Sequence, residues 1–128
     1  MSHVDWIFIV AGSLGCIVAV VHGVILQKKM VTPILTEMEL AESLRRLIPL
    51  LLHFSTVFWF LGGIALIATP MYPNEYITLA TAFFVGVLFA FGAIGNFWGT
   101  HGRHPGWVIL AVATALIIYG CSQLVLAT

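Results

Sequence analysis

The sequence predicts an all-α integral membrane protein, an antiparallel bundle of four transmembrane helices with a short interfacial helix in the first loop. Of its 128 residues, 61% are hydrophobic and only 8% are charged, whereas soluble domains are about 45–50% apolar. The apolar residues form long runs, and the charged residues lie outside those runs. These observations indicate a single transmembrane domain over residues 1–128.

The apolar runs are long enough to cross a bilayer, which requires about 20 predominantly apolar residues per helix. The predicted spans, none of which contains Asp, Glu, Lys or Arg, are residues 6–26, 47–69, 77–98 and 107–127. Helix signals mark several boundaries. Ser2 and Asp5 form a capping-box pattern before the first span, Asn74 can cap the third, and Pro105 suits the first turn of the fourth.

The connection between the first two spans is the longest and has helix signals of its own. Thr36 and Glu39 form a second capping-box pattern, and Glu42 can pair with Arg46 one turn later. This pattern predicts a short interfacial helix that runs into the second span. Pro49, just inside that span, predicts a bend.

The basic residues are confined to two loops, the first and the third. They are Lys28, Lys29, Arg45 and Arg46 in the first loop and Arg103 in the third. Under the positive-inside rule both loops face the cytoplasm, so both termini are predicted to be non-cytoplasmic. We expect these basic residues to form a lipid interface, with membrane lipids as partners, because cationic side chains at the cytoplasmic surface attract anionic head groups.

Small residues recur at helical spacing in two of the spans, the first and the third. The sets are Gly12/Cys16, Gly15/Ala19/Gly23, Ala82/Gly86/Ala90 and Gly95/Gly99. Such faces let helices approach closely. They are typical of contacts within a bundle, and the alternative is that one of them docks a partner.

Histidines are expected to gather at the same membrane face as the basic residues. His22 and His53 lie near the inner ends of the first two spans, and His101 and His104 lie in the third loop, GTHGRHPGW. Imidazole is an axial ligand of haem and a common ligand of transition metals. His22 and His53 are therefore candidate ligands of a cofactor such as haem b, and His101 and His104 are candidate ligands of a transition metal.

The histidines also have two plainer interpretations. In one, His22 and His53 hydrogen-bond across the bundle or to interfacial water, as polar groups in spans generally do. In the other, the histidines and the basic residues together hold an anionic lipid head group or a quinone.

The sequence favours a function other than catalysis. It contains no paired carboxylates within the spans, no nucleophile–base spacing, no phosphate-binding glycine loop and no basic-aromatic surface for nucleic acid. Its loops are too short for a catalytic domain. We therefore expect a non-enzymatic accessory or interaction subunit of a larger membrane complex, or a homo-oligomer. The alternative is a haem- or metal-binding electron-transfer protein.

Three segments carry a resemblance to known proteins. In order, they read HGVILQKKMVTPIL, RRLIPLLLHFSTVFWFLGG and GRHPGWVIL. Their assembly resembles a recurrent group of small bacterial four-span proteins of no known activity, and implies a location in the bacterial inner membrane. The segment HFSTVFWFLGG is also similar to a His…Trp-Gly-Gly pattern of copper-resistance-type membrane domains, which would make His53 a ligand. The methionine and histidine clusters expected on the outer side of those domains are absent here, since Met71 and His3 alone do not make one.

Overall fold

The protein is all-helical in the computed structural model, which describes residues 2–72 and 74–127. Helices make up 90% of the chain and the described residues contain no strand. The helices are α1 (His3–Leu26), α2 (Thr32–Glu37), α3 (Glu42–Ala68), α4 (Glu75–Thr100) and α5 (Gly106–Ala127), with a π-helical segment at Gln27–Val31 and a short 3₁₀ turn at Thr69–Met71. Four helices are long and apolar enough to cross a membrane, which confirms the prediction of an all-helical chain with four candidate spans.

The first helix is much longer than the sequence predicts. α1, the π-helical segment and α2 form one continuous helix of 35 residues, His3–Glu37, or about 52 Å at 1.5 Å per residue. Thr36 therefore begins no helix: it lies in the last turn of α2, where its hydroxyl donates to the Thr32 carbonyl at 2.9 Å. The capping-box prediction at Thr36 and Glu39 is wrong because the helix arriving from the first span already includes Thr36.

The other helix starts follow the local sequence signals. Ser2 caps α1 in a reciprocal capping box with Asp5. The Asn74 side chain accepts a hydrogen bond from the Ile77 amide at 3.2 Å and caps α4. Pro105 directly precedes α5, and its carbonyl accepts from the Val108 amide. These caps are set by neighbouring residues in the chain, so the sequence alone predicts them.

The second long helix, α3, begins among charged residues. Arg46 and Glu42 form the predicted ion pair one turn apart, at 2.9 Å. Pro49 lies inside α3 and the helix continues through it to Ala68.

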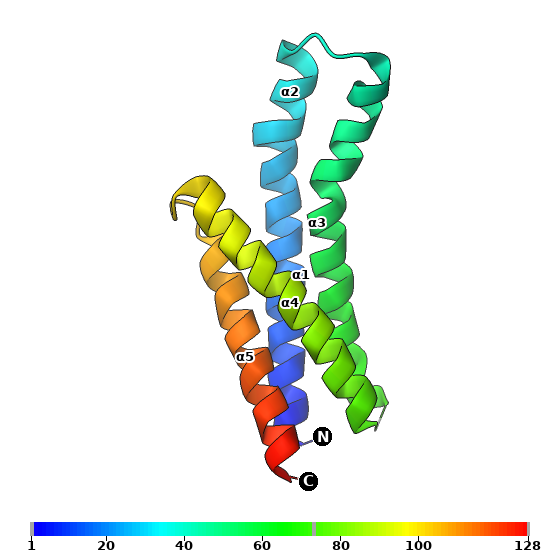
Figure 1. Ribbon diagram of the computed structural model, residues 1–128, viewed down its shortest axis with the longest axis vertical. Coiled ribbons are helices and arrows are strands. Elements are labelled where there is room, and N and C mark those ends of the chain that lie inside the picture. The colour runs from blue at the N-terminus through cyan, green and yellow to red at the C-terminus, as the bar shows by residue number, and fades with distance from the viewer. Residues whose placement is uncertain (1, 73, 128) are drawn as a thin grey trace.

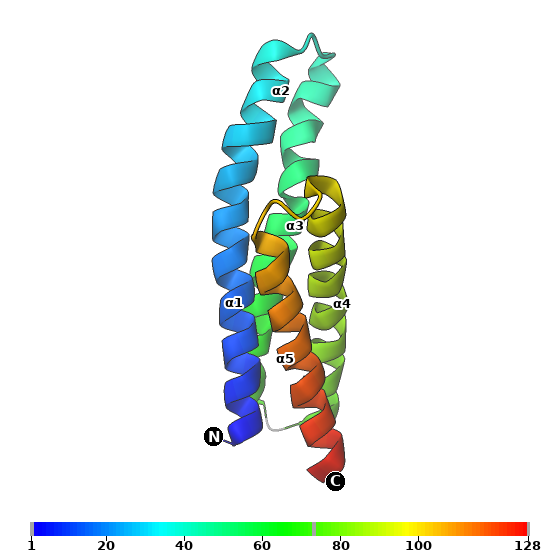
Figure 2. The same cartoon turned by 90° about the vertical axis from the view of Figure 1, so that its left-hand side faces the viewer.

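The helices form a bundle with both termini at one end (Figures 1 and 2). α1 packs against α3 and α5, and α4 packs against α5 and α3. The core between them contains Phe8, Leu66, Phe89 and Leu110, each essentially inaccessible to solvent. Asp5 and Glu75 lie in first helical turns at the terminal end, whereas the loops that carry the basic residues lie at the opposite end.

Small residues bring the helices of the bundle together. A Cβ atom added at Gly12 would lie 2.5 Å from the Gly63 carbonyl oxygen, so α1 and α3 are in backbone contact there. Gly15 similarly leaves space for the Phe89 ring of α4. By contrast, a Cβ atom added at Gly95 or Gly99 would have nothing within 4 Å. The small-residue faces of α1 are thus internal contacts, and that of Gly95 and Gly99 is open.

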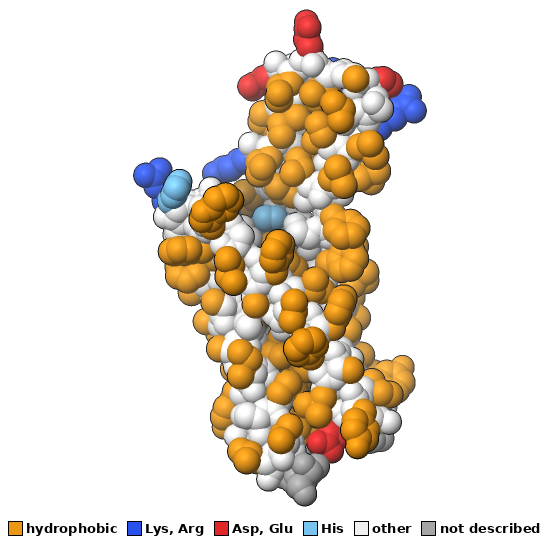
Figure 3. All heavy atoms as spheres, in the orientation of Figure 1, with side chains coloured by type: hydrophobic (Ala, Val, Ile, Leu, Met, Phe, Trp, Pro, Cys, Tyr) orange, Lys and Arg blue, Asp and Glu red, His pale blue; other side chains and the backbone are white. Residues whose placement is uncertain are grey.

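One end of the molecule consists of two helices only. The long first helix and α3 extend beyond the loop between α4 and α5 (Figures 1 and 2). We call this extension, residues 27–48, the projecting hairpin. Val31 is buried at 1% exposure, but none of the described residues of α2 is buried. The space-filling view shows apolar side chains over the hairpin and charged ones around its tip (Figure 3).

Candidate functional site

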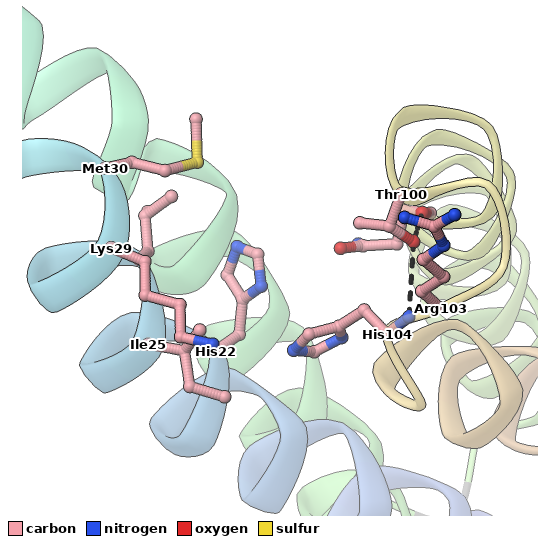
Figure 4. Close-up of a pocket in the computed structure, with 9 residues that line it drawn as sticks. His22, Ile25, Lys29, Met30, Thr100, Arg103 and His104 are labelled. Carbon is pink, nitrogen blue, oxygen red and sulfur yellow. Dashed lines mark hydrogen bonds between the residues drawn. The ribbon is translucent and has the colours of Figure 1, made fainter.

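A pocket of about 420 Å³ lies at the base of the projecting hairpin, between the first helix and the end of α4. Its lining consists of His22, Ile25, Leu26, Lys29, Met30, Asn96, Thr100, Arg103 and His104. In Figure 4, His22 and Lys29 lie on one wall, and Thr100, Arg103 and His104 lie on the other. The pocket therefore lies between the long first helix and the third loop.

The third loop owes its shape to the way α4 ends. His101 is in the left-handed region, at φ 50°, and is followed by Gly102 at φ 74°. The Gly102 amide donates to the Phe97 carbonyl at 2.8 Å and the His101 amide donates to the Trp98 carbonyl at 3.3 Å. These two bonds form a Schellman motif, in which the left-handed position is usually glycine. His101 is thus exposed at a backbone corner and does not line the pocket.

The next turn of the loop is fixed by side chains. The Trp107 indole N–H donates to the Gly102 carbonyl at 3.2 Å, and its ring meets the Phe97 ring edge-on at 5.0 Å. The His104 amide donates to the Thr100 hydroxyl oxygen at 3.4 Å. This turn directs the His104 imidazole across the pocket toward the first helix (Figure 4).

The hydrogen bonding of His104 determines what its ring offers the pocket. Its Nδ1 accepts a hydrogen bond from the Gly106 amide at 3.1 Å. A neutral imidazole has one acceptor nitrogen and one N–H donor. With Nδ1 occupied as the acceptor, the Nε2 atom of His104 carries the proton and acts as a donor.

His22 also faces this pocket and contacts the bundle core. Its ring centroid lies 4.8 Å from that of Trp59 of α3, with the two planes tilted by 55°. Trp59 is buried, and its other side packs where Gly92 of α4 leaves space for it. Trp59 therefore connects the histidine of α1 to the interior between α3 and α4.

His53 lies in different surroundings. Its Nε2 is 2.9 Å from the side-chain oxygen of Gln27, and it does not line the pocket. The hydrogen bond with Gln27 joins α3 to the start of the π-helical segment. The structure therefore brings His22 and His104 to one pocket and leaves His53 and His101 outside it. Among residues 2–72 and 74–127, no three His, Cys, Asp or Glu side chains are grouped to hold a metal ion.

The basic residues divide in the same way. Lys29 and Arg103 line the pocket, whereas Lys28, Arg45 and Arg46 do not. Arg46 is paired with Glu42 on the hairpin. The predicted lipid interface thus includes one pair of cations that share a pocket.

Several residues of this region escape sequence-based reasoning. Gln27 directly precedes Lys28 and belongs to no recognisable motif, yet its side chain is hydrogen-bonded to His53. Met30 and Ile25 line the pocket and look like ordinary hydrophobic residues in the sequence. Asn96, a polar residue within a span, is the one available signal, and it too lines the pocket.

Comparison of the chain with models of known protein families, with curated proteins and with solved structures gives no match. Function is therefore inferred from the chain's own residues.

Proposed function

We propose that this protein is a non-enzymatic accessory subunit of a larger membrane assembly. Its four long helices are antiparallel spans of the bacterial inner membrane, with both termini outside the cytoplasm and the hairpin on the cytoplasmic side. Its partners are membrane lipids and a second membrane protein. The confinement of all five Lys and Arg residues to the first and third loops supports this orientation.

The observation that carries the proposal is an exposed apolar stripe on α3. Leu44, Leu47, Leu51 and Phe54 are 48%, 49%, 69% and 61% exposed. Their spacing of three, four and three residues places them on one helix face. We call these residues the α3 stripe.

The α3 stripe continues from the apolar part of α3 into its charged first turns. Leu44 lies between Glu42 and Arg45, and such charged residues are costly within hydrocarbon. Leu44 and Leu47 therefore lie at head-group level, where acyl chains do not cover them. Exposed apolar surface rimmed by charged residues is typical of a protein interaction site.

The length of the projecting hairpin defines the kind of partner. The first helix, about 52 Å long, exceeds the roughly 30 Å hydrocarbon core. α4 and α5 end below its upper part, which has α3 beside it. A partner helix that leaves the membrane and continues into the cytoplasm would cover this surface. We therefore infer that the α3 stripe docks such a helix from a larger membrane protein.

Extraction in a mild detergent at native expression level, with mass measurement of the intact complex, tests this function. We expect a second protein at a fixed ratio. The variant Leu44→Ala/Leu47→Ala should weaken this association about 30-fold, since each truncation removes on the order of 1 kcal/mol of apolar burial. The matched control is Val87→Ala/Ile94→Ala, which truncates exposed side chains of α4 and should retain the partner.

Two outcomes would contradict the proposal. A stable monomer that carries no partner would exclude the accessory role. A homo-oligomer that dissociates in the variant Leu44→Ala/Leu47→Ala would contradict the second protein. The α3 stripe would then dock another copy of this chain.

The cofactor role has less support from the geometry. A haem held by His22 and His53 would need both imidazoles to face the same iron. Instead, the His22 ring contacts Trp59 and the His53 ring is hydrogen-bonded to Gln27. The optical spectrum of the purified protein, oxidised and reduced, distinguishes the two functions. A Soret band that is lost in His22→Ala and in His53→Ala would favour the electron-transfer alternative.

A further inference from the structure

We infer that the pocket at the base of the projecting hairpin binds the phosphate group of an anionic membrane phospholipid. This ligand site is independent of the partner proposed for the α3 stripe. Four features of the pocket support it: its charge, the hydrogen-bond donors that it offers, its apolar side chains and its depth in the bundle.

The charges around the pocket are of one sign. Lys29 of the long first helix and Arg103 of the third loop, 74 positions apart in the chain, both line it. Among the described lining residues none is acidic. The acidic residue nearest to the arginines of the hairpin, Glu42, is already paired with Arg46. Two cationic side chains that line one pocket, with no carboxylate in its described lining, favour an anionic ligand.

Three of the side chains that line the pocket, Lys29, Arg103 and His104, offer N–H donors to a ligand. Nε2 of His104 carries a proton because Nδ1 accepts from Gly106. Lys29 and Arg103 can only donate. The Thr100 hydroxyl donates to the Asn96 carbonyl at 2.6 Å, so its proton is already used. The phosphodiester of a phospholipid, which supplies only acceptor oxygens at neutral pH, matches these donors.

The first-helix wall of the pocket also carries apolar side chains beside His22 and Lys29, which favours an amphiphile over a free anion. These side chains are Ile25, Leu26 and Met30 (Figure 4 shows Ile25 and Met30 beside Lys29). A phospholipid would place its phosphate between Lys29 and Arg103 and its first methylene groups against Ile25 and Met30. Inorganic phosphate would leave this wall without a partner.

The pocket also lies at the depth that a head group requires. On the first helix it extends from His22 to Met30, where the apolar run gives way to the basic pair Lys28 and Lys29. This is the level at which a bilayer changes from acyl chains to phosphates. Figure 3 shows basic and histidine side chains around the hollow at the base of the hairpin.

Native mass spectrometry of the detergent-solubilised protein tests the inference. Phosphatidylglycerol is titrated against phosphatidylcholine, with wild type and Lys29→Gln/Arg103→Gln compared. We expect one phosphatidylglycerol molecule to bind preferentially, and the double variant to weaken it roughly 30-fold, since each basic group near a head group contributes about a fivefold factor. The control Lys28→Gln/Arg45→Gln also removes one lysine and one arginine, but both lie outside the pocket. It should bind phosphatidylglycerol as wild type does.

Two further arms separate lipid binding in the pocket from misfolding and from binding of a free anion. Lys29→Arg/Arg103→Lys retains both charges and should restore binding, which shows that a weak Lys29→Gln/Arg103→Gln variant has lost charge and not its fold. Inorganic phosphate at millimolar concentration should not displace the lipid. Displacement by inorganic phosphate, equal binding of both lipids, or equal losses in the pocket variant and its control would each overturn the inference.

Discussion

The backbone contact between α1 and α3 allows a sharp test of the bundle through the substitution Gly63→Ala. A Cβ atom at Gly63 would lie 2.5 Å from the Gly12 carbonyl oxygen and 2.6 Å from the Cys16 sulfur. The helices would have to separate by about 0.9 Å to restore an ordinary contact of 3.4 Å. Because the carbonyl oxygen belongs to a helix backbone, it cannot rotate away as a side chain would.

The expected cost of Gly63→Ala follows from these contacts. Overpacking of a tight contact typically destabilises a protein by about 1–3 kcal/mol, and a rigid backbone neighbour favours the upper part of that range. Replacement of a helical glycine by alanine otherwise gains up to about 1 kcal/mol. We therefore expect Gly63→Ala to lower the free energy of unfolding by about 2 kcal/mol net.

The matched control is Gly95→Ala on α4. No atom lies within 4 Å of the new Cβ position there, so only the helix-propensity gain remains and the variant should be as stable as wild type or more so. Unfolding of both variants in mixed micelles of a mild detergent and sodium dodecyl sulfate, followed by circular dichroism, measures the difference. Equal stability of Gly63→Ala and Gly95→Ala would refute the close approach of α1 and α3.

A second pair of measurements separates the two clashes at Gly63. The double variant Gly63→Ala/Cys16→Ala removes the sulfur contact and leaves the Gly12 carbonyl contact. It should recover only part of the lost stability relative to Cys16→Ala alone. Full recovery would show that the helix backbones move apart freely and that the sulfur alone sets the cost.

The remaining predictions use the same unfolding assay. Trp59→Ala should destabilise the protein by about 3–5 kcal/mol because removal of a buried ring leaves a cavity. Trp6 is 57% exposed, so Trp6→Ala should cost far less. Similar costs for the two variants would contradict the core position of Trp59. His101→Gly should stabilise by about 1 kcal/mol because glycine adopts a left-handed φ without strain, and a loss of stability would contradict the Schellman geometry. Asn74→Ala should cost about 1 kcal/mol through loss of the α4 cap and Asn74→Ser much less, whereas equal values would show that the cap has no energetic effect.

Features that depend on neighbouring residues were predictable from the sequence. The four apolar helices follow from composition and length, because a backbone in hydrocarbon must satisfy its hydrogen bonds within a helix. The caps at Ser2 and Asn74 follow from residues three positions away. The ion pair of Glu42 with Arg46 follows from their spacing of one turn.

Features that depend on helix rotation were not predictable. Every face of the long helices is rich in apolar residues, so periodicity does not show which side of α1 meets α3. His22 and His53 are predicted at similar depths from their positions in the first two spans. Their separate partners, Trp59 and Gln27, become evident only in the packed bundle. The start predicted at Thr36 was wrong for a related reason: a local capping pattern does not reveal that the previous helix is still continuing.

The unequal lengths of the helices account for both proposed sites. α4 ends at Thr100, level with the pocket, while the first helix and α3 continue beyond it. The turn that closes α4 therefore meets the side of the first helix and encloses a pocket, and the part of α3 above that turn keeps an exposed face. The pocket is lined by the long first helix, the end of α4 and the third loop, and the α3 stripe lies on α3, so the two sites share no residue. Leu44→Ala/Leu47→Ala should consequently leave phosphatidylglycerol binding unchanged, and a loss of lipid in that variant would show that the hairpin and the pocket act as one site.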